Sequence, residues 1–367
     1  MKKLFEIMQV CHAPDAGTLV NTTQNYVNAY DGSTTAFAAP NDLSSLMKTY
    51  YDTELLENAR PNLIHAQFAR KQPLPKGRGK KVEWRKFNTL ADASALTEGV
   101  IPTGQKFGQS SMTASILQYG TYLTVSDQLE LHAIDNVILS ATEELGASAG
   151  TTQDKLVRDT LAAGTTVQYC DKVSAAGAHT AAETRAGMDT TSKLTPTEVN
   201  KAVTTLKKLK APTINGKYVA IIHPSVSYDL RENKEWIEAH KYAAVTPLFT
   251  GEIGELHGVR FIETTEAKIW NNNTCPVKTA AGSGGTPAAT YYSVYSTLFL
   301  GKDAFGMIDP EGGGLEMIVK SKEQAGGPLN QFSTLGYKFS TATKILYQDR
   351  MVRVESLSEY SGTDEAN

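Results

Sequence analysis

Two strand-like runs separated by a long tip are the feature that most limits how this chain can fold. The runs cover residues 81–87 and 111–126, and the tip between them is rich in Gly, Pro, Ser and Thr. An isolated two-stranded ribbon is marginal in water and needs a third strand, a helix or another chain over its apolar face. A loop longer than about 15 residues is uncommon and usually functional. We therefore expect an arm that reaches onto a neighbouring subunit.

The second run changes its apolar face partway along. Met112, Ala114 and Ile116 share one face, whereas Leu117, Tyr119, Leu123 and Val125 share the other. Side chains of a strand alternate with a period of two, so a switch at Ile116-Leu117 requires an interruption. The pattern predicts either a bulge in an ordinary sheet or a strand that leaves one packing environment for another.

Composition places the chain among ordinary soluble globular proteins. Its 367 residues allow about two domains, and a net charge of −3 with 20% charged and 41% apolar residues gives no sign of a nucleic-acid binder. Cys11, Cys170 and Cys275 form no C-x-x-C pair, which argues against a disulfide framework or a zinc knuckle and favours a reducing compartment. We expect no signal peptide and no membrane span.

The rest of the chain divides into helical and strand-like stretches. Short helices are expected after Pro40 and near Asp52, and the longest helix over residues 134–163. Gly146 and Gly150 lie in the middle of that helix, where each costs about 1 kcal/mol in helix propensity. We interpret both glycines as sites of close packing in a spine helix.

A compact α/β unit is expected next, because strands and helices alternate. Thr195 and Glu198 form a predicted capping box with Pro196 at the first helical position. Predicted strands cover residues 217–222 and 258–263, with a helix from His223 between them, and residues 271–290 form a low-complexity surface loop. Further strands are predicted at 291–300, 315–319, 336–346 and 351–357.

A search for catalytic signatures finds none. The chain has no G-x-S-x-G elbow, P-loop, G-x-G-x-x-G or H-E-x-x-H motif, and its histidines lack metal-ligand spacing. His223 closes a buried strand and is interpreted as a histidine hydrogen-bonded at a strand end. We therefore expect no enzyme, no cofactor, no metal site and no small-molecule substrate.

Basic residues crowd the beginning of the predicted arm. They are Arg70, Lys71, Lys76, Arg78, Lys80, Lys81, Arg85 and Lys86, with Glu83 the only acid among them. Three interpretations stay open. The cluster pairs with acids of a neighbour, such as Glu143 or Glu144, it contacts phosphates of DNA, or it is a solvated face.

Scattered apolar residues mark the arm itself and are predicted to contact another subunit. They are Trp84, Phe87, Leu96, Val100, Ile101 and Phe107.

The order of these parts resembles the tailed-phage major capsid proteins of the Hong Kong 97 type, and among them the branch of the N-four-like podophages. The resemblance is carried by ELLENARPNLIH at 54–65, GKKVEWRKF at 79–87, LTEG at 96–99, QYGTY at 118–122, Ser126-Asp127, Arg158-Asp159, GYK at 336–338 and MVRVE at 351–355. It implies an α+β fold with an N-terminal arm, a long β-hairpin extended loop, a peripheral domain containing the spine helix and an α/β axial domain.

The resemblance also implies how the chain is divided. We expect an N-terminal arm with short helices at 1–60, the extended-loop hairpin at 61–126, and the spine helix with the first part of the peripheral domain at 127–195. The axial domain, including the surface loop 271–290, covers 196–314, and closing strands with a C-terminal tail cover 315–367.

The implied function is a viral structural protein that self-assembles into hexamers and pentamers of an icosahedral shell around double-stranded DNA. The implied partners are further copies of the chain, scaffolding and portal proteins, a decoration protein, and packaged DNA bound without sequence preference. The implied location is the virion, after assembly in the host cytoplasm. Two alternatives remain: an encapsulin-like compartment that encloses cargo enzymes, and an α/β protein with a small-molecule site.

Overall fold

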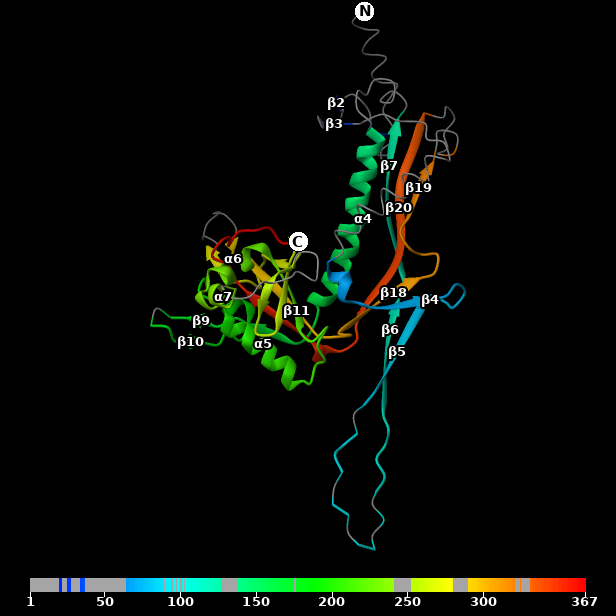
Figure 1. The fold of residues 1–367 in the computed structure, drawn as a ribbon. Coiled ribbons are helices and arrows are strands. Elements are labelled where there is room, and N and C mark those ends of the chain that lie inside the picture. Colours follow the sequence, from blue (N-terminus) through cyan, green and yellow to red (C-terminus); the bar gives the residue numbers. More distant parts are fainter. Residues whose placement is uncertain are drawn as a thin grey trace, which may run out of the picture. The chain divides into compact units, whose positions relative to one another are not determined.

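A computed structural model describes residues 64–126, 137–240, 252–279, 290–320, 324 and 331–367, except positions 89, 94, 97, 100, 102 and 175, together with 20–21, 25–27 and 34–36 (Figure 1). The chain forms two compact units, each built from three stretches. The first comprises Met1–Leu63, Gln118–Thr152 and Gly312–Ser340, and the second comprises Ile64–Leu117, Gln153–Glu311 and Thr341–Asn367. Helix α4 (Val137–Ala162) and strand β20 (Phe332–Ile345) contribute residues to both.

The second unit contains a mixed sheet that carries most of its core. Its strand order is β12 (Glu252–Leu256), β13 (Val259–Glu263), β11 (Tyr218–Ile222), β17 (Val294–Leu300), β21 (Met351–Ser356) and β8 (Val167–Tyr169), with β14 (Ile269–Trp270) paired to β17. β11 and β17 are buried along their whole length. Central strands covered on both faces read as continuous apolar runs, which is how this part of the sequence reads.

Helices α5 (Pro196–Lys208), α6 (Pro224–Glu232) and α7 (Lys234–His240) belong to the same unit. Leu206 of α5 and Trp236 of α7 lie in one buried cluster with Phe261 and Phe299 of the sheet. Pro196 begins α5 as predicted, but the predicted capping box is wrong. Thr195 makes no side-chain capping bond, and the Glu198 carboxylate is held by Lys201 and Gln168.

The arm begins in the second unit. A 3-10 turn, η2 (His65–Phe68), leads into β4 (Arg70–Leu74), which pairs in parallel with β18 (Phe305–Pro310), and β18 pairs with the end of β20. β5 (Lys81–Phe87) and β6 (Gln109–Ser115) form an antiparallel ribbon from Lys81 opposite Ser115 to Phe87 opposite Gln109. Beyond this ladder the two chain segments continue side by side to the tip (Figure 1).

The same chain covers the apolar face of the ribbon's base. Val82, Trp84, Ala114 and Ile116 pack with Leu74, Ile308 and Ala342 in one cluster. The other face, with Lys81, Glu83 and Arg85, is exposed. The cover that a two-stranded ribbon needs therefore comes from β4, β18 and β20 at its base, and only the tip lacks it within the described residues.

The first unit contains a sheet in which β7 (Leu117–Ser126) pairs with β1 (Val20–Asn21) and β20, and β20 pairs with β19 (Glu316–Lys320). Glycines allow β7 and β20 to approach closely. A Cβ on Gly120 would lie 2.5 Å from the Tyr337 carbonyl oxygen, and one on Gly336 would lie 2.7 Å from the Cβ of Tyr122. The GYK motif at 336–338 thus begins with a residue that must lack a side chain.

The predicted change of face at Ile116 is confirmed. β6 ends at Ser115 and belongs to the ribbon, whereas β7 begins at Leu117 and belongs to another sheet. The run is therefore two strands in different packing environments rather than one bulged strand.

The predicted spine helix is confirmed as α4 within the described residues. The helices expected after Pro40 and near Asp52 lie outside the described residues, as does the whole of 281–289 in the predicted surface loop. Short paired strands complete the chain: β2 (Asn25–Val27) with β3 (Thr34–Ala36), β9 (Lys172–Val173) with β10 (His179–Thr180), and β15 (Val277–Thr279) with β16 (Thr290–Tyr291). None of the helices in the described residues has the length and hydropathy to cross a bilayer.

Candidate assembly surfaces

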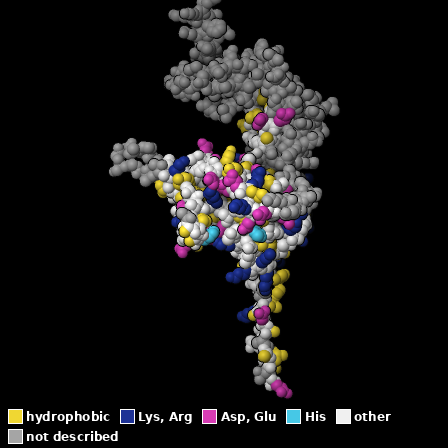
Figure 2. All heavy atoms as spheres, turned by 60° about the vertical axis from the view of Figure 1, so that its left-hand side comes forward, with side chains coloured by type: hydrophobic (Ala, Val, Ile, Leu, Met, Phe, Trp, Pro, Cys, Tyr) yellow, Lys and Arg dark blue, Asp and Glu magenta, His cyan; other side chains and the backbone are white. Residues whose placement is uncertain are grey.

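The tip of the arm exposes large apolar side chains. Ile101 is 94% exposed and Leu96 75%, and Phe87 and Phe107 stack on each other with ring centroids 4.8 Å apart while remaining more than half exposed. Val100 lies outside the described residues. Figure 2 shows hydrophobic side chains along one side of the projecting ribbon and Lys and Arg side chains along the other. Exposed apolar surface is typical of interaction sites, and the contact of these residues with another subunit stays a prediction.

The eight basic residues occupy the start of the ribbon. Arg70 and Lys71 lie in β4, Lys76, Arg78 and Lys80 in the turn that follows, and Lys81, Arg85 and Lys86 in β5. Lys86 is half-buried and the other seven are exposed. Within the described part of the chain, the cluster makes ion pairs only from Arg85 to Glu83, at 3.6 Å, and from Lys86 to Asp349, at 3.9 Å.

Part of this cluster surrounds a pocket of about 330 Å³ at the ribbon's base. The lining residues are Arg70, Glu83, Trp84, Arg85, Lys86, Met112, Leu346 and Tyr347. Trp84, predicted to contact another subunit, therefore has one side in this pocket and another in its own chain's apolar cluster.

Both glycines of the spine helix are buried. Between them, the Ser148 hydroxyl lies 3.1 Å from the Tyr337 hydroxyl of β20, which is also 3.4 Å from Thr152 Oγ1. These contacts place this turn of α4 against the sheet of the first unit.

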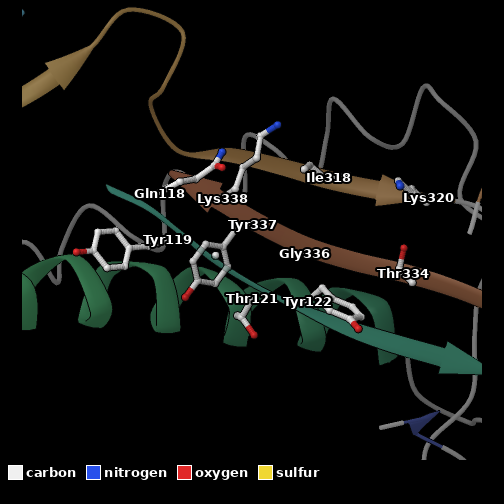
Figure 3. Close-up of a pocket in the computed structure, with 11 residues that line it drawn as sticks. Gln118, Tyr119, Thr121, Tyr122, Ile318, Lys320, Thr334, Gly336, Tyr337 and Lys338 are labelled. Atoms are coloured by element: carbon white, nitrogen blue, oxygen red, sulfur yellow. The ribbon is translucent and has the colours of Figure 1, made fainter. Parts of the chain in front are cut away.

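A shallow groove of about 550 Å³ lies on that sheet (Figure 3). Its lining comes from β7, β19 and β20, with Gly120 and Gly336 beside Tyr122, Ile318 and Lys338. In Figure 3 Tyr119 and Tyr337 point toward α4, whereas Gln118 and Lys338 point to the opposite face. The groove holds no group of acids, bases or nucleophiles arranged for catalysis.

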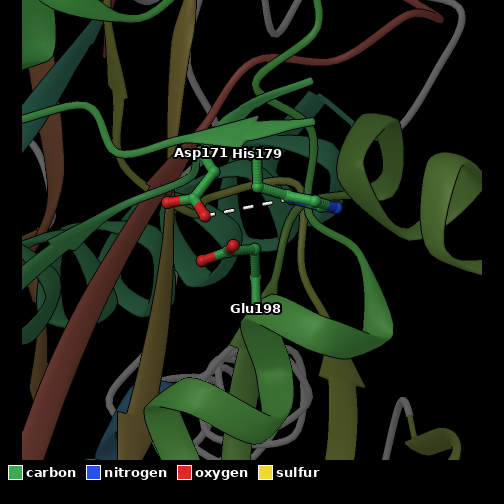
Figure 4. A group of neighbouring side chains, drawn as sticks. All are labelled: Asp171, His179 and Glu198. Carbon is green, nitrogen blue, oxygen red and sulfur yellow. Dashed lines mark ion pairs between the residues drawn. The ribbon is translucent and has the colours of Figure 1, made fainter. Parts of the chain in front are cut away.

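Asp171, His179 and Glu198 approach one another closely enough to suggest a metal site (Figure 4). Each offers one ligand atom, and these atoms all lie within 4.8 Å of one another. However, Lys201 Nζ donates to both carboxylates, at 2.8 Å to Glu198 Oε1. Burial lowers the pKa of Lys201, but its hydrogen bonds to Asp171 and Glu198 raise it more, so the ammonium is retained. Lys201 therefore offsets one of the two carboxylate charges, and its contacts join Asp171, which precedes β9, to Glu198 of α5.

A buried ion network explains the MVRVE motif. Glu355 is fully buried, and it accepts hydrogen bonds from Arg185 at 2.6 and 2.7 Å and from Arg353 at 2.9 Å. The Arg185 guanidinium also lies 3.9 Å from the centre of the Trp270 ring. Burial lowers the pKa of Arg185, but the Glu355 carboxylate raises it more. Removing one partner of such a pair would leave a buried unpaired charge, so the network is structural.

Cys170 is fully buried, and burial together with the charge of Glu198 raises the pKa of its thiol well above the usual value. Such a thiol is protonated and unreactive. Cys275 is also buried, and Cys11 lies outside the described residues.

The prediction for His223 is confirmed: its Nδ1 accepts a hydrogen bond from the Ser225 backbone N–H at 3.2 Å, which caps α6. For a second histidine, His65, the sequence pattern predicted no role. Its backbone N–H and Nδ1 contact the two carboxylate oxygens of Asp154 at 2.8 and 2.6 Å, and both residues are buried. This pair joins η2 to the part of α4 that lies in the second unit.

Replacing His223 by asparagine is expected to weaken the pH dependence of stability. Burial lowers the pKa of His223 below 6.5, its ordinary value, so below pH 6.5 the unfolded chain takes up a proton before the folded one does. The free energy of unfolding therefore falls as the pH drops below 6.5 and levels off below the folded pKa. His223→Asn keeps a capping acceptor without titrating. Denaturant unfolding across this pH range measures the change.

The control for this prediction is His257→Asn. His257 is exposed and has φ of 51°, a conformation that asparagine accepts readily. The control should unfold with the pH dependence of the unchanged protein. Equal slopes for all three proteins would contradict the prediction.

An exposed apolar arm, a spine helix on a sheet and a separate α/β unit together define a shell-forming structural subunit with the Hong Kong 97-type α+β fold. The chain belongs to the phage capsid protein family, whose model matches residues 47–326. It is a major capsid subunit, self-assembles into a capsid shell and is part of the virion. No curated protein matches the chain.

Solved phage capsids share the fold at low sequence identity. The capsid protein of Ralstonia phage GP4 is 12% identical with a TM-score of 0.58, over 82% of this chain and 89% of that one. The capsid protein of cyanophage Pam1 is 12% identical with a TM-score of 0.54, over 91% of this chain and 99% of that one. The capsid protein of Helicobacter pylori bacteriophage KHP30 is 10% identical with a TM-score of 0.54, over 78% of this chain and 87% of that one. The match to the phage capsid family model does not favour the encapsulin alternative.

Proposed function

We propose that the subunit forms hexamers and pentamers of an icosahedral shell that encloses double-stranded DNA. The observation that carries this proposal is the exposed tip of the arm, where Leu96 and Ile101 present apolar surface to solvent. A closed assembly buries the same patch on every copy, since symmetric contacts repeat around each axis. The apolar tip residues then contact a second copy, and Gly146 and Gly150 are sites of close packing in the spine helix.

The finer parts of the proposal follow from the same family. Scaffolding and portal proteins guide assembly in the host cytoplasm, a decoration protein binds the shell, and DNA is held without sequence preference. The five-segment division from N-terminal arm to closing strands describes the organisation of the subunit. No chemistry is assigned to the chain, and its role is structural.

The test is expression of the full chain followed by sedimentation and negative-stain microscopy. We expect closed particles whose images average with five-fold and six-fold capsomers. Nucleic-acid content after infection distinguishes a genome shell from a cargo compartment. A chain that stays monomeric at high concentration, with a tip resistant to protease, would refute the proposal.

A further inference from the structure

The pocket at the base of the ribbon collects positive charge from separate elements. Arg70 comes from β4, Arg85 and Lys86 come from β5, and Tyr347 follows β20. The remaining cations of the cluster do not line it. The residues that line it do not include Lys71 of β4, Lys81 of β5, or the turn residues Lys76, Arg78 and Lys80.

The cations of this pocket are incompletely neutralised. No carboxylate of the described residues lies within ion-pair distance of Arg70, and Arg85 has only the exposed Glu83 at 3.6 Å. Lys86 Nζ is 3.9 Å from Asp349 and 4.7 Å from the centre of the Tyr347 ring, on which Arg350 also stacks at 3.8 Å.

These cations suit one oxyanion, because guanidinium binds carboxylate and phosphate with paired hydrogen bonds.

The position of the pocket favours a single carboxylate over DNA. Its cations gather at one site, whereas DNA backbones are bound by stripes of cations that follow successive phosphates. Furthermore, the pocket lies at the base of the arm, which the proposed function places against another subunit.

We propose that this pocket receives one carboxylate of a second copy of the chain, with Arg70, Arg85 and Lys86 as its cationic partners. The inference rests on the proposed function. The captured carboxylate fixes the base of the arm in the shell, while the tip supplies apolar contact farther along. Arg70 and Arg85 give the site its geometry, and Lys86 is close enough to a bound carboxylate to form an amide with it when that carboxylate is chemically activated.

The first test compares two variants that each lose two positive charges from the same ribbon base. R70Q with R85Q removes guanidinium groups of the pocket, whereas R78Q with K80Q removes charges outside it. We expect the pocket variant to give an empty-particle yield about tenfold lower than the unchanged protein, the consequence of a weakened charge pair at each contact. The control variant should assemble normally, and both should keep the circular dichroism spectrum and melting temperature of the unchanged subunit.

The second test identifies the partner directly. Particles assembled from equal amounts of unlabelled and heavy-isotope-labelled chains are treated with a zero-length carbodiimide, digested and analysed by mass spectrometry. We expect Lys86 joined to an Asp or Glu peptide of the other isotope in particles and not in unassembled subunits. Cross-linking of Lys86 to Asp349 of its own chain alone would overturn the inference.

The remaining outcomes separate the two proposals. Unchanged protein that forms no particles would refute the proposed shell. Normal particles from the unchanged protein and from the pocket variant would refute the carboxylate site alone. The carboxylate site would also be refuted if the pocket variant formed normal empty particles and it alone retained less DNA. That result would assign the pocket to phosphate.

Discussion

Replacing residues 90–109 by a short glycine linker is expected to leave a folded subunit that forms no stable particles. The tip contributes little to the rest of the subunit, because its described backbone contacts reach no farther than the end of the ribbon. Gln105 donates to the Ala91 oxygen within the tip, the Gly108 oxygen accepts from the Asn88 N–H, and Gln109 pairs with Phe87. We expect the free energy of unfolding to change by less than about 0.5 kcal/mol, as for surface changes elsewhere. Chemical unfolding and particle yield are measured on the same preparation.

A control removes apolar surface from another place. Leu209→Ser with Ile237→Ser changes side chains that are 40% and 45% exposed in the second unit. This control should assemble as the unchanged protein does. If the tip deletion lowered stability and particle yield together, the tip would belong to the subunit's own core and the assembly role would be wrong.

Replacing both Gly146 and Gly150 by leucine is expected to destabilise the first unit by several kcal/mol. Both glycines are buried, and they lie on the same side of α4 because they are four residues apart. Adding a large side chain at a tight contact costs about 1–3 kcal/mol per site. This loss exceeds the gain of about 1 kcal/mol in helix propensity for each replaced glycine. Denaturant unfolding, monitored by circular dichroism, measures the net change in the free energy of unfolding.

Glu143→Leu is the control on the same helix, because Glu143 is exposed. Its effect should stay within about 0.5 kcal/mol. If the doubly substituted protein were more stable than the original, leucine would fit this side of the helix. The interpretation of both glycines as sites of close packing would then be wrong.

Local pattern was enough to predict much of the fold. The change of apolar face at Ile116 predicted the point where the chain leaves the ribbon, since alternation with a period of two is a property of each strand alone. His223 was interpreted correctly because a histidine between a buried strand and Pro224 is in position to cap a helix. Helix α4 followed from apolar spacing over its whole length.

Contacts between distant segments could not be predicted in this way. The Glu198 carboxylate has the spacing of a capping box, yet Lys201 and Gln168 hold it, and Asp171 completes the group from another element. Likewise, the eight basic residues form one run in the sequence, but only Arg70, Arg85 and Lys86 line a pocket. The deciding neighbours Tyr347 and Asp349 lie more than two hundred positions away.

The division of each unit into three stretches has a consequence for the order in which the protein is made. The first unit needs the stretch 312–340, so the sheet strands β19 and β20 are missing until most of the chain has left the ribosome. At about 5–20 residues per second, synthesis of the intervening residues takes on the order of tens of seconds. During that time the tip of the arm, which is made early, exposes its apolar side chains while the first unit is still incomplete. A nascent chain therefore presents the apolar tip before its own fold is finished.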